Sequence, residues 1–499
     1  MNSTLKYNFV ANLIGKIWTG LISISIIPVY IYLLGIEAYG LIGIFLSIIA
    51  ILAFLDFGLG NVLNHQLAKM SLDDSNPVNM HNLVNTLEII YWAVGICTGI
   101  SLVLLSSTIS TNWIKPELLN SEYVEDAIKL MGVVLLCQWP RSLYYAGLMG
   151  LQKQVAMNVS STVMATLLNI GGVLILLIFT PTIHALFYWY LVVGLLETLI
   201  ARYLLIKALP KHLLPGQFKI KKLTKDIWHF AVGVTGVTIV ATILTQLDKV
   251  ILSKVLSLEN FAYYSIASRL AAGLYYFISP VTSAFFPKLT QLAMSENKEE
   301  LAKVYHTGCQ LLSISILPIT VILSLFSNEL LFHWTQNQSV ADNSSSLLTI
   351  LTIGTAINGM IAMPASLQFA HGWTKLTFYF NLFAVVLIAP ATYLLASYFG
   401  PIGAAWVWLI LNCSYVLFMI RIMHKRILKE QMWHWFKYDF GFPSLAVIIV
   451  AVSWKLIFPS PDTLFSLILN IIGVSFFTVT VSVASSPLIF EKILYKFKF

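Results

Sequence analysis

Residues 9–34 read FVANLIGKIWTGLISISIIPVYIYLL and hold a single charged side chain, Lys16. A helix rises about 1.5 Å per residue, so this run can cross the roughly 30 Å hydrocarbon core of a bilayer. No small-residue cleavage site follows it, so we expect a retained span rather than a removed signal peptide. Apolar runs of similar length recur to the end of the chain, and the run at 9–34 therefore sets the pattern for the whole fold.

The composition of the whole chain agrees with this pattern. Of 499 residues, 58% are hydrophobic and 10% are charged, against roughly 25% charged residues in ordinary soluble domains. A water-soluble protein could not cover that much apolar surface with so few polar side chains. The apolar runs do not alternate with polar residues, which argues against a membrane β-barrel. We therefore predict an all-α, polytopic membrane protein.

About fourteen transmembrane helices are expected from the apolar runs. Their predicted ranges are 9–34, 41–63, 85–106, 128–150, 156–180, 184–206, 228–252, 261–285, 307–328, 346–368, 377–399, 402–421, 441–459 and 464–489.

The basic residues predict which side of the membrane each loop faces. With the N-terminus in the cytoplasm, 20 of the 30 Lys and Arg residues fall in cytoplasmic segments. Two, Lys115 and Lys254, fall on the opposite side, and the remaining eight lie within spans or at their ends. Such a bias follows the positive-inside rule and explains the net charge of +8 without any nucleic-acid partner. An even number of spans then places both termini in the cytoplasm.

The chain also carries an internal repeat. The segment LGIEAYG at residues 34–40 has an echo, LSLENFA, at residues 256–262, and the same offset relates Lys153 to Lys375. Six predicted spans separate the members of each pair, which indicates a parallel repeat of two six-helix lobes. Chance similarity in a sequence of biased composition is the alternative. The predicted domains are an N-lobe at 1–206, a basic cytoplasmic linker at 207–226, a C-lobe at 227–421, an interfacial amphipathic segment at 422–440, and two C-terminal helices with a cytoplasmic tail at 441–499.

Three motifs resemble one family of transporters. The LGIEAYG segment at 34–40, DFGL at 56–59 and QLDK at 246–249 are similar to the polysaccharide flippases of the multidrug/oligosaccharidyl-lipid/polysaccharide (MOP) exporter superfamily. The resemblance implies a flippase in a bacterial inner membrane, acting on undecaprenyl-pyrophosphate-linked oligosaccharide. It implies movement of this lipid from the cytoplasmic to the outer leaflet by alternating access, coupled to a gradient of H⁺ or Na⁺.

Several basic residues are candidates to bind the pyrophosphate of such a cargo. A charge at mid-bilayer costs about 3 kcal/mol or more, so it normally faces the helix bundle or a water-filled cavity. Arg141 and Arg269 lie deep within predicted spans, Lys16 lies a turn or two inside the first span, and Lys249 lies near the outer end of the seventh. Arginine binds phosphate oxygens through its planar fork and stays charged. The alternatives are structural ion pairs for the arginines, with Asp56 or Glu197 for instance, and snorkelling to the membrane surface for the lysines.

Three acidic residues are candidates for ion coupling. Asp56 and Glu197 lie within spans, and Asp248 lies beside Lys249. Burial raises the pKa of a carboxylate and a neighbouring arginine lowers it, so spatial proximity decides whether such a group titrates.

No metal site and no cofactor are expected. The ten histidines form no His-x-x-x-His pair, and the four cysteines fall inside apolar runs without paired spacing. Two other functions stay open. One is a multidrug or cation antiporter of the same superfamily, and the other is a membrane glycosyltransferase or polymerase acting on the same lipid. Acid clusters and a large outer loop, which such enzymes usually need, are missing from the sequence, so a transporter rather than an enzyme is predicted.

Overall fold

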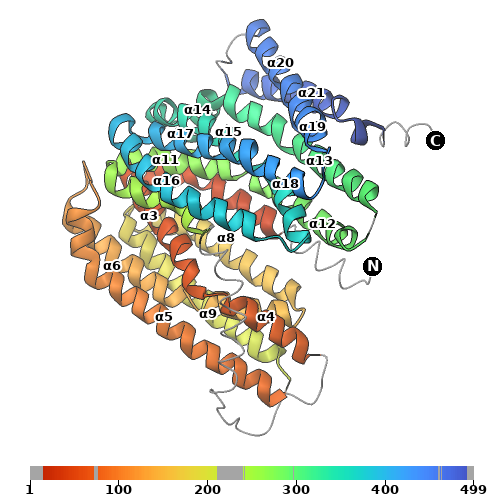
Figure 1. Ribbon diagram of the computed structural model, residues 1–499. Coiled ribbons are helices and arrows are strands. Elements are labelled where there is room, and N and C mark those ends of the chain that lie inside the picture. Colours follow the sequence, from red (N-terminus) through yellow and green to blue (C-terminus); the bar gives the residue numbers. More distant parts are fainter. Residues whose placement is uncertain are drawn as a thin grey trace. The chain divides into compact units, whose positions relative to one another are not determined.

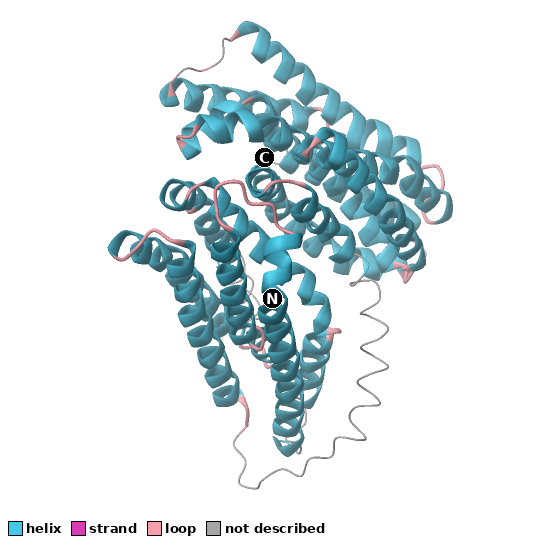
Figure 2. Cartoon of the chain, turned by 90° about the vertical axis from the view of Figure 1, so that its left-hand side faces the viewer, coloured by secondary structure: helices cyan, strands magenta, loops and turns pink. Residues whose placement is uncertain are grey.

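A computed structural model describes residues 15–71, 77–210, 240, 242–295, 297–458, 461 and 463–491 of the chain. Every regular element among these residues is a helix, and short loops join most of them (Figures 1 and 2). The all-α fold predicted from the sequence is confirmed. The chain divides into two units, Met1–Ala262 and Tyr263–Phe499.

The first unit contains the N-terminal helices. Their bounds are Gly15–Leu34, which includes α2 (Ile27–Leu34), then α3 (Ile36–Leu52), the 3₁₀ turn η1 (Ala53–Asp56), α4 (Leu59–Met70), α5 (Pro77–Asn112), α6 (Ser121–Gln138), α7 (Arg141–Gly150), α8 (Gln154–Ile178), α9 (Ile183–Ala208) and helical residues 242–255. Helix α11 (Leu258–Ala272) begins in this unit and ends in the next.

The second unit contains the remaining helices. They are α12 (Tyr275–Ala293), α13 (Lys298–Leu325), α14 (Ser327–Thr335), α15 (Gln338–Ala370), α16 (Lys375–Phe399), α17 (Pro401–Ser414), the π-helical stretch η2 (Tyr415–Met419), α18 (Ile420–Arg426), α19 (Met432–His434), the π-helical stretch η3 (Trp435–Gly441), α20 (Phe442–Ile457) and α21 (Leu464–Ala484).

Twelve helices among the described residues are long and apolar enough to cross a membrane. They correspond to twelve of the fourteen predicted spans. The span predicted at 128–150 is divided between α6 and α7, and α6 carries charged residues in its first half. Most of the basic linker, from residue 211 on, and much of the span predicted at 228–252 lie outside the described residues. The number fourteen therefore stays a prediction, whereas the multi-pass membrane character of the protein is clear.

Small residues let helices of the first unit approach closely. Helix α5 packs along α6, and a Cβ atom added at Gly99 would lie 2.7 Å from the carbonyl oxygen of Gly132. A Cβ atom added at Gly132 would likewise lie 2.7 Å from the carbonyl oxygen of Gly99. Only glycine at both positions allows the two backbones to touch, as at close helix crossings in membrane proteins.

In the second unit, α13 is the central packing partner. It contacts α12, α15, α20 and α21. Residues 432–441 continue directly into α20, and their side chains divide between two environments: Trp435 is 1% exposed whereas Trp433 is 65% exposed. The placement of residues 422–440 at the membrane interface stays a prediction.

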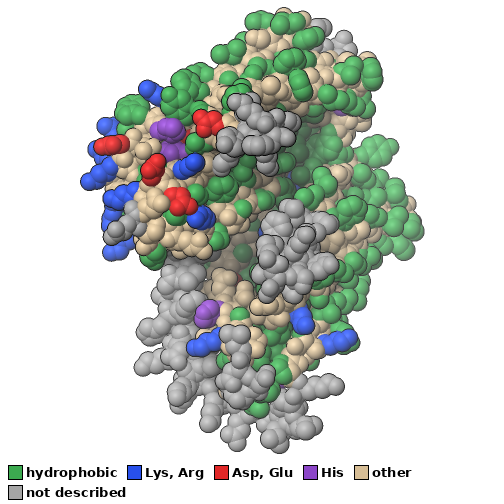
Figure 3. Space-filling model, turned by 90° about the vertical axis from the view of Figure 1, so that its right-hand side faces the viewer, with side chains coloured by type: hydrophobic (Ala, Val, Ile, Leu, Met, Phe, Trp, Pro, Cys, Tyr) green, Lys and Arg blue, Asp and Glu red, His purple; other side chains and the backbone are tan. Residues whose placement is uncertain are grey.

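Large apolar side chains remain exposed on many helices. Leu104 on α5, Phe383 on α16 and Phe465 on α21 are each more than three-fifths exposed. On the face shown in Figure 3, hydrophobic side chains cover broad areas, and most of the charged side chains lie toward the left-hand edge. In water such a surface would cause aggregation, but in a bilayer it contacts lipid chains.

Candidate functional site: a polar cavity in the first unit

A cavity of about 340 Å³ lies within the first unit. The segments that surround it are α3, η1, α4, α6 and α7. Its polar lining residues are Asp56, Asn61, Gln138, Arg141 and Ser142. Two of the charged residues predicted from the sequence, Asp56 and Arg141, therefore line one cavity although they are 85 positions apart in the chain.

A break in the second span positions Asp56. Helix α3 gives way to the 3₁₀ turn η1, and then Phe57 and Gly58 adopt left-handed backbone angles, with φ of 47° and 71°. Helix α4 starts again at Leu59, and the backbone N–H of Gly60 donates to Asp56 Oδ1 at 3.3 Å. The DFGL motif thus interrupts the helix at the point where its carboxylate reaches the cavity. Irregular backbone at membrane depth is tolerated where it lines a cavity.

A second break positions Arg141. Helix α6 ends at Gln138, and α7 begins at Arg141 after Pro140, which has no backbone N–H to donate. The Gln138 amide donates to the carbonyl oxygen of Tyr190 at 3.3 Å. This bond ties the end of α6 to α9, and it fixes the Gln138 side chain on the cavity wall.

Arg141 forms an ion pair with Glu197 on α9, through Nη1 and Oε2. The Tyr145 hydroxyl donates to the other carboxylate oxygen, Glu197 Oε1, at 3.0 Å. Glu197 is buried, whereas the Arg141 side chain retains 31% of its exposure. The guanidinium group therefore has a fixed partner on one side and lines the cavity on the other.

The other predicted residues lie apart from this lining. Lys16 is exposed, Asp248 and Lys249 are half-buried, and Lys249 Nζ donates to Gln246 Oε1 at 3.3 Å. Arg269 lies on α11 in the second unit, half-buried, and makes no ion pair with another described residue. Asp56, Arg141 and Glu197 are thus the predicted residues that the structure brings together.

Sequence reasoning did not single out Gln138, Asn61 or Tyr145. All three are neutral, and none belongs to a motif. A polar side chain in a membrane helix is a weak signal, because many such residues only hydrogen-bond a neighbouring turn.

A second polar contact lies in the same unit, away from the cavity lining. Arg202 Nε donates to Glu88 Oε1 at 2.5 Å, and the Tyr144 hydroxyl donates to the same oxygen at 2.7 Å. The Arg202 side chain is 45% exposed. This Arg–Glu pair resembles the Arg141–Glu197 pair chemically but lies outside the cavity lining. A variant of Arg202 is therefore a matched control for a variant of Arg141.

An apolar groove of about 410 Å³ lies in the second unit, between α13, α15 and α20. Its lining is largely aliphatic and aromatic, with Lys455 as its one charged lining residue among those described. A groove of this kind accommodates an apolar chain and offers little to a sugar or phosphate.

The sequence is similar to known proteins of polysaccharide biosynthesis and transport. The sequence model of a family described as "Polysaccharide biosynthesis protein" matches residues 32–334. A curated protein of Shigella flexneri, named "Putative O-antigen transporter", is 22% identical over 401 residues, which cover 80% of this chain and 93% of that protein.

Solved structures share the fold. A lipid II flippase, MurJ, in an inward closed conformation has a TM-score of 0.72 at 15% identity, covering 98% of this chain and 99% of that one. An inward-facing multidrug resistance MATE family transporter of the MOP superfamily has a TM-score of 0.64 at 15% identity, covering 84% and 96%. At these identities the likeness concerns the fold alone. The family match over residues 32–334 confirms the resemblance to polysaccharide transporters that the sequence motifs indicated.

Proposed function

The chain belongs to the polysaccharide biosynthesis protein family, and on that basis we propose that it is a flippase for undecaprenyl-pyrophosphate-linked oligosaccharide. It carries the lipid from the cytoplasmic to the outer leaflet of a bacterial inner membrane, with both of its termini in the cytoplasm. The relative from Shigella flexneri supports a saccharide cargo through its name, and the MurJ structure supports a lipid-linked one.

The observation that carries the proposal is the position of Arg141. This arginine lines the cavity between α3, α4, α6 and α7, and its side chain keeps 31% of its exposure although it pairs with Glu197. A pyrophosphate offers several oxygens and more negative charge than one carboxylate, so it competes with Glu197 for the five N–H donors of the arginine. Arg141 is therefore the proposed anchor for the cargo's charged group.

Three further basic residues are proposed to contact the cargo's pyrophosphate during transport. Arg269 has no carboxylate partner among the described residues, so its charge is available to a cargo anion. Lys16 is exposed, and Lys249 has only a neutral partner, Gln246. We assign these residues to successive contacts with the pyrophosphate as two six-helix lobes rock around it. The polyprenyl tail stays in apolar surroundings, for which the groove lined by α13, α15 and α20 is suited.

Ion coupling is assigned to the acidic residues. Among the described residues, Asp56 accepts one hydrogen bond, from the backbone N–H of Gly60, and it lines the same cavity as Arg141. H⁺ or Na⁺ bound at Asp56 would remove a negative charge from the cavity and so strengthen anion binding at Arg141. Glu197 and Asp248 are the other proposed coupling residues.

One observation favours a second function, an antiporter for organic cations. A carboxylate in the cavity, Asp56, would attract a positive drug as readily as a coupling ion. The MATE family transporters, which share the fold, are named for multidrug resistance.

The deciding experiment uses proteoliposomes that contain a fluorescent undecaprenyl-pyrophosphate oligosaccharide. A membrane-impermeant quencher reports which leaflet the lipid occupies while a proton or sodium gradient is imposed. We expect gradient-dependent exchange that Arg141→Ala slows about tenfold or more, since a charge-assisted hydrogen bond contributes about 1.5–3 kcal/mol. Arg202→Ala, which removes a chemically matched arginine outside the cavity lining, should exchange lipid close to the native rate. Absence of exchange, together with gradient-driven efflux of an organic cation, would assign the protein to the antiporters.

A further inference from the structure

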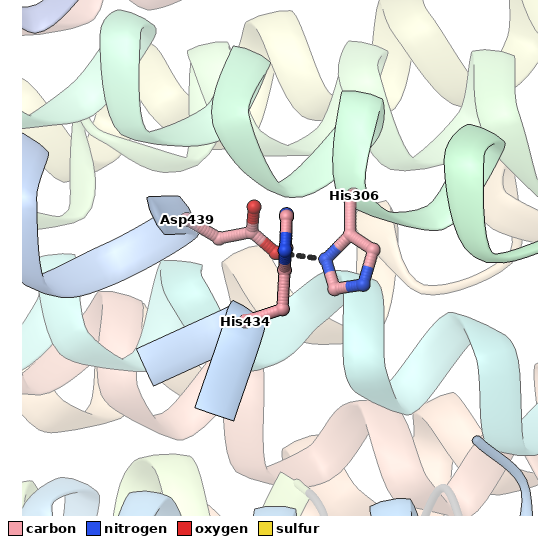
Figure 4. A group of neighbouring side chains, drawn as sticks. All are labelled: His306, His434 and Asp439. Atoms are coloured by element: carbon pink, nitrogen blue, oxygen red, sulfur yellow. Dashed lines mark hydrogen bonds and ion pairs between the residues drawn. The ribbon is translucent and has the colours of Figure 1, made fainter. Parts of the chain in front are cut away.

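Three metal-binding side chains meet inside the second unit. They are His306 on α13, His434 on α19 and Asp439 on η3, and Figure 4 shows them converging on one point. One ring nitrogen of each histidine and one carboxylate oxygen of Asp439 lie within 4.8 Å of one another. The two imidazole rings have centroids 4.3 Å apart. None of these residues lines the polar cavity of the first unit or the apolar groove of the second.

Two of the three residues are buried, His434 is half-buried, and most of their polar atoms are hydrogen-bonded. His306 is 3% exposed and Asp439 is 1% exposed. His306 Nδ1 contacts Asp439 Oδ2, and the Gln310 amide donates to Asp439 Oδ1 at 3.1 Å. His434 Nε2 is the exception, because it is buried and has no hydrogen-bond partner among the described residues. An unpaired buried ring nitrogen is costly, so it points to a ligand.

The π-helical winding of η3 explains why two of the groups face the same way. In an α-helix, side chains five residues apart point about 140° away from each other. The wider winding of a π-helix, with its i→i+5 hydrogen bonds, brings such residues closer to one face, and these rare turns are frequent at functional sites. His434 and Asp439 are five residues apart, and residues 435–441 are π-helical. The local backbone therefore directs both side chains toward His306.

The hydrogen-bond partners favour a cation between His306 and Asp439. His306 Nε2 lies 3.1 Å from Gln431 Oε1, an acceptor that requires a proton on Nε2. In a neutral imidazole, Nδ1 then has a lone pair, and it faces the carboxylate oxygen of Asp439. Two acceptors in contact need a cation between them, either a proton on Nδ1 or a metal ion.

From this geometry we propose that His306, His434 and Asp439 bind a divalent transition-metal ion of the Zn²⁺ type. Zn–N and Zn–O bonds of about 2.0–2.2 Å place the donors of a tetrahedral site about 3.3–3.5 Å apart. Side-chain rotations that separate His306 Nδ1 from Asp439 Oδ2 would bring the three donors to this spacing. Two neutral imidazoles and one carboxylate are typical ligands for Zn²⁺ and unsuitable for Mg²⁺. Gln431 and Gln310 serve as outer partners that orient His306 and Asp439.

The metal would fasten the C-terminal helices to α13. Asp439 and His434 precede α20, and its neighbour α21 packs on α13. Two further bonds join the same parts: the Ser313 hydroxyl donates to the backbone carbonyl of Asp439, and the Leu488 N–H donates to Gln310 Oε1 at 3.0 Å. The ion would add to these bonds, because its ligands come both from α13 and from residues 434–439.

The test is Co²⁺ and Zn²⁺ binding by the full-length protein in detergent, after tag removal and dialysis against a chelator. We expect one equivalent of Co²⁺ with the visible absorption of a tetrahedral site, displaced by Zn²⁺ and unaffected by Mg²⁺. His434→Phe keeps a ring beside His306 and removes a ligand. It should weaken Co²⁺ binding by more than the roughly 10–100-fold that loss of an outer partner costs.

Two further variants complete the design. His434→Cys should restore binding and add a sulfur-to-cobalt absorption band, which tests the ligand position even if binding by His434→Phe is too weak to measure. His371→Ala changes an exposed histidine of the same unit and should bind like the native protein. If the native protein took up no Co²⁺, or if His434→Phe took up as much as His371→Ala, the cluster would hold a proton and the metal proposal would be wrong.

Discussion

Gly40 lies against Leu258: a Cβ atom at position 40 would be 2.7 Å from the backbone oxygen of Leu258 and 2.9 Å from a methyl carbon of its side chain. Gly40 ends the LGIEAYG segment and Leu258 belongs to the LSLENFA segment at 256–262, so the two segments of the predicted repeat touch within the first unit. The Leu258 N–H donates to the carbonyl oxygen of Lys115 at 2.9 Å, which extends the contact to the loop after α5. The motif thus has a packing role that its sequence alone does not reveal.

Gly40→Ala is expected to destabilise the first unit. The added methyl group must displace a backbone oxygen, which cannot rotate away, and such overpacking costs about 1–3 kcal/mol. We expect a lower apparent melting temperature in detergent and slower lipid exchange. Leu258→Ala should not rescue the variant, because the backbone oxygen at 2.7 Å remains. Full rescue by Leu258→Ala would show that only the Leu258 side chain is in the way.

Glu37 supports the same region through its carboxylate. It is buried and accepts three backbone hydrogen bonds, from the N–H groups of Glu117 at 2.6 Å, Leu118 at 3.0 Å and Leu119 at 2.9 Å. Hydrogen bonds to a charged group contribute about 1.5–3 kcal/mol each, so we expect Glu37→Ala to cost several kcal/mol. The stability of Glu37→Gln should lie between those of the native protein and Glu37→Ala, because the amide keeps one acceptor oxygen.

The measurement for Glu37 is the apparent melting temperature of each purified variant. Glu117→Gln is the control, because that side chain is exposed and its backbone N–H is unchanged. Equal melting temperatures for Glu37→Ala and Glu117→Gln would contradict a structural role for the Glu37 carboxylate.

Tyr144 fixes the Glu88–Arg202 pair from inside the bundle. Its ring is fully buried, and its hydroxyl donates to Glu88 Oε1 at 2.7 Å. Tyr144→Phe should therefore destabilise the protein by about 1.5–3 kcal/mol, the contribution of a hydrogen bond to a charged group. Tyr203→Phe, at a residue that is 61% exposed, should leave the melting temperature unchanged. A Tyr144→Phe variant as stable as Tyr203→Phe would mean that water replaces the hydroxyl.

Most of the fold could be predicted because each span is a local signal. A run such as residues 377–399 identifies its own helix, and α16 covers Lys375–Phe399. The breaks within spans are harder to predict, because each depends on only a few residues. Pro140 divides the span predicted at 128–150, and the left-handed angles of Phe57 and Gly58 end the second span near Asp56, before its predicted end at residue 63.

The candidate site could be predicted only in part. A buried charge in a membrane helix is unusual, and this indicated Asp56, Arg141 and Glu197 one by one. Their proximity depends on how η1, α7 and α9 pack, which no local pattern reveals. The His306–Asp439 contact spans 133 positions, and His434 and Asp439 share a face only through a π-helix. A search for α-helical metal spacing therefore could not find this cluster.

Arg141 can act as the anchor for the cargo or only as the structural partner of Glu197. Exchanging the two residues distinguishes these roles. In Arg141→Glu/Glu197→Arg the pair can re-form, but the positive charge moves from the cavity wall to the buried position on α9. Breaking a buried pair costs about 3–5 kcal/mol, so each single variant should be less stable than the double variant.

The most direct test of the proposed anchor is the initial rate of lipid exchange in proteoliposomes that contain this double variant. If Arg141 binds the pyrophosphate, the apparent melting temperature should recover toward the native value while exchange stays at least about tenfold slower, the factor for loss of about 1.4 kcal/mol. If exchange recovers together with stability, Arg141 serves only as a structural partner of Glu197, and the cargo is held elsewhere.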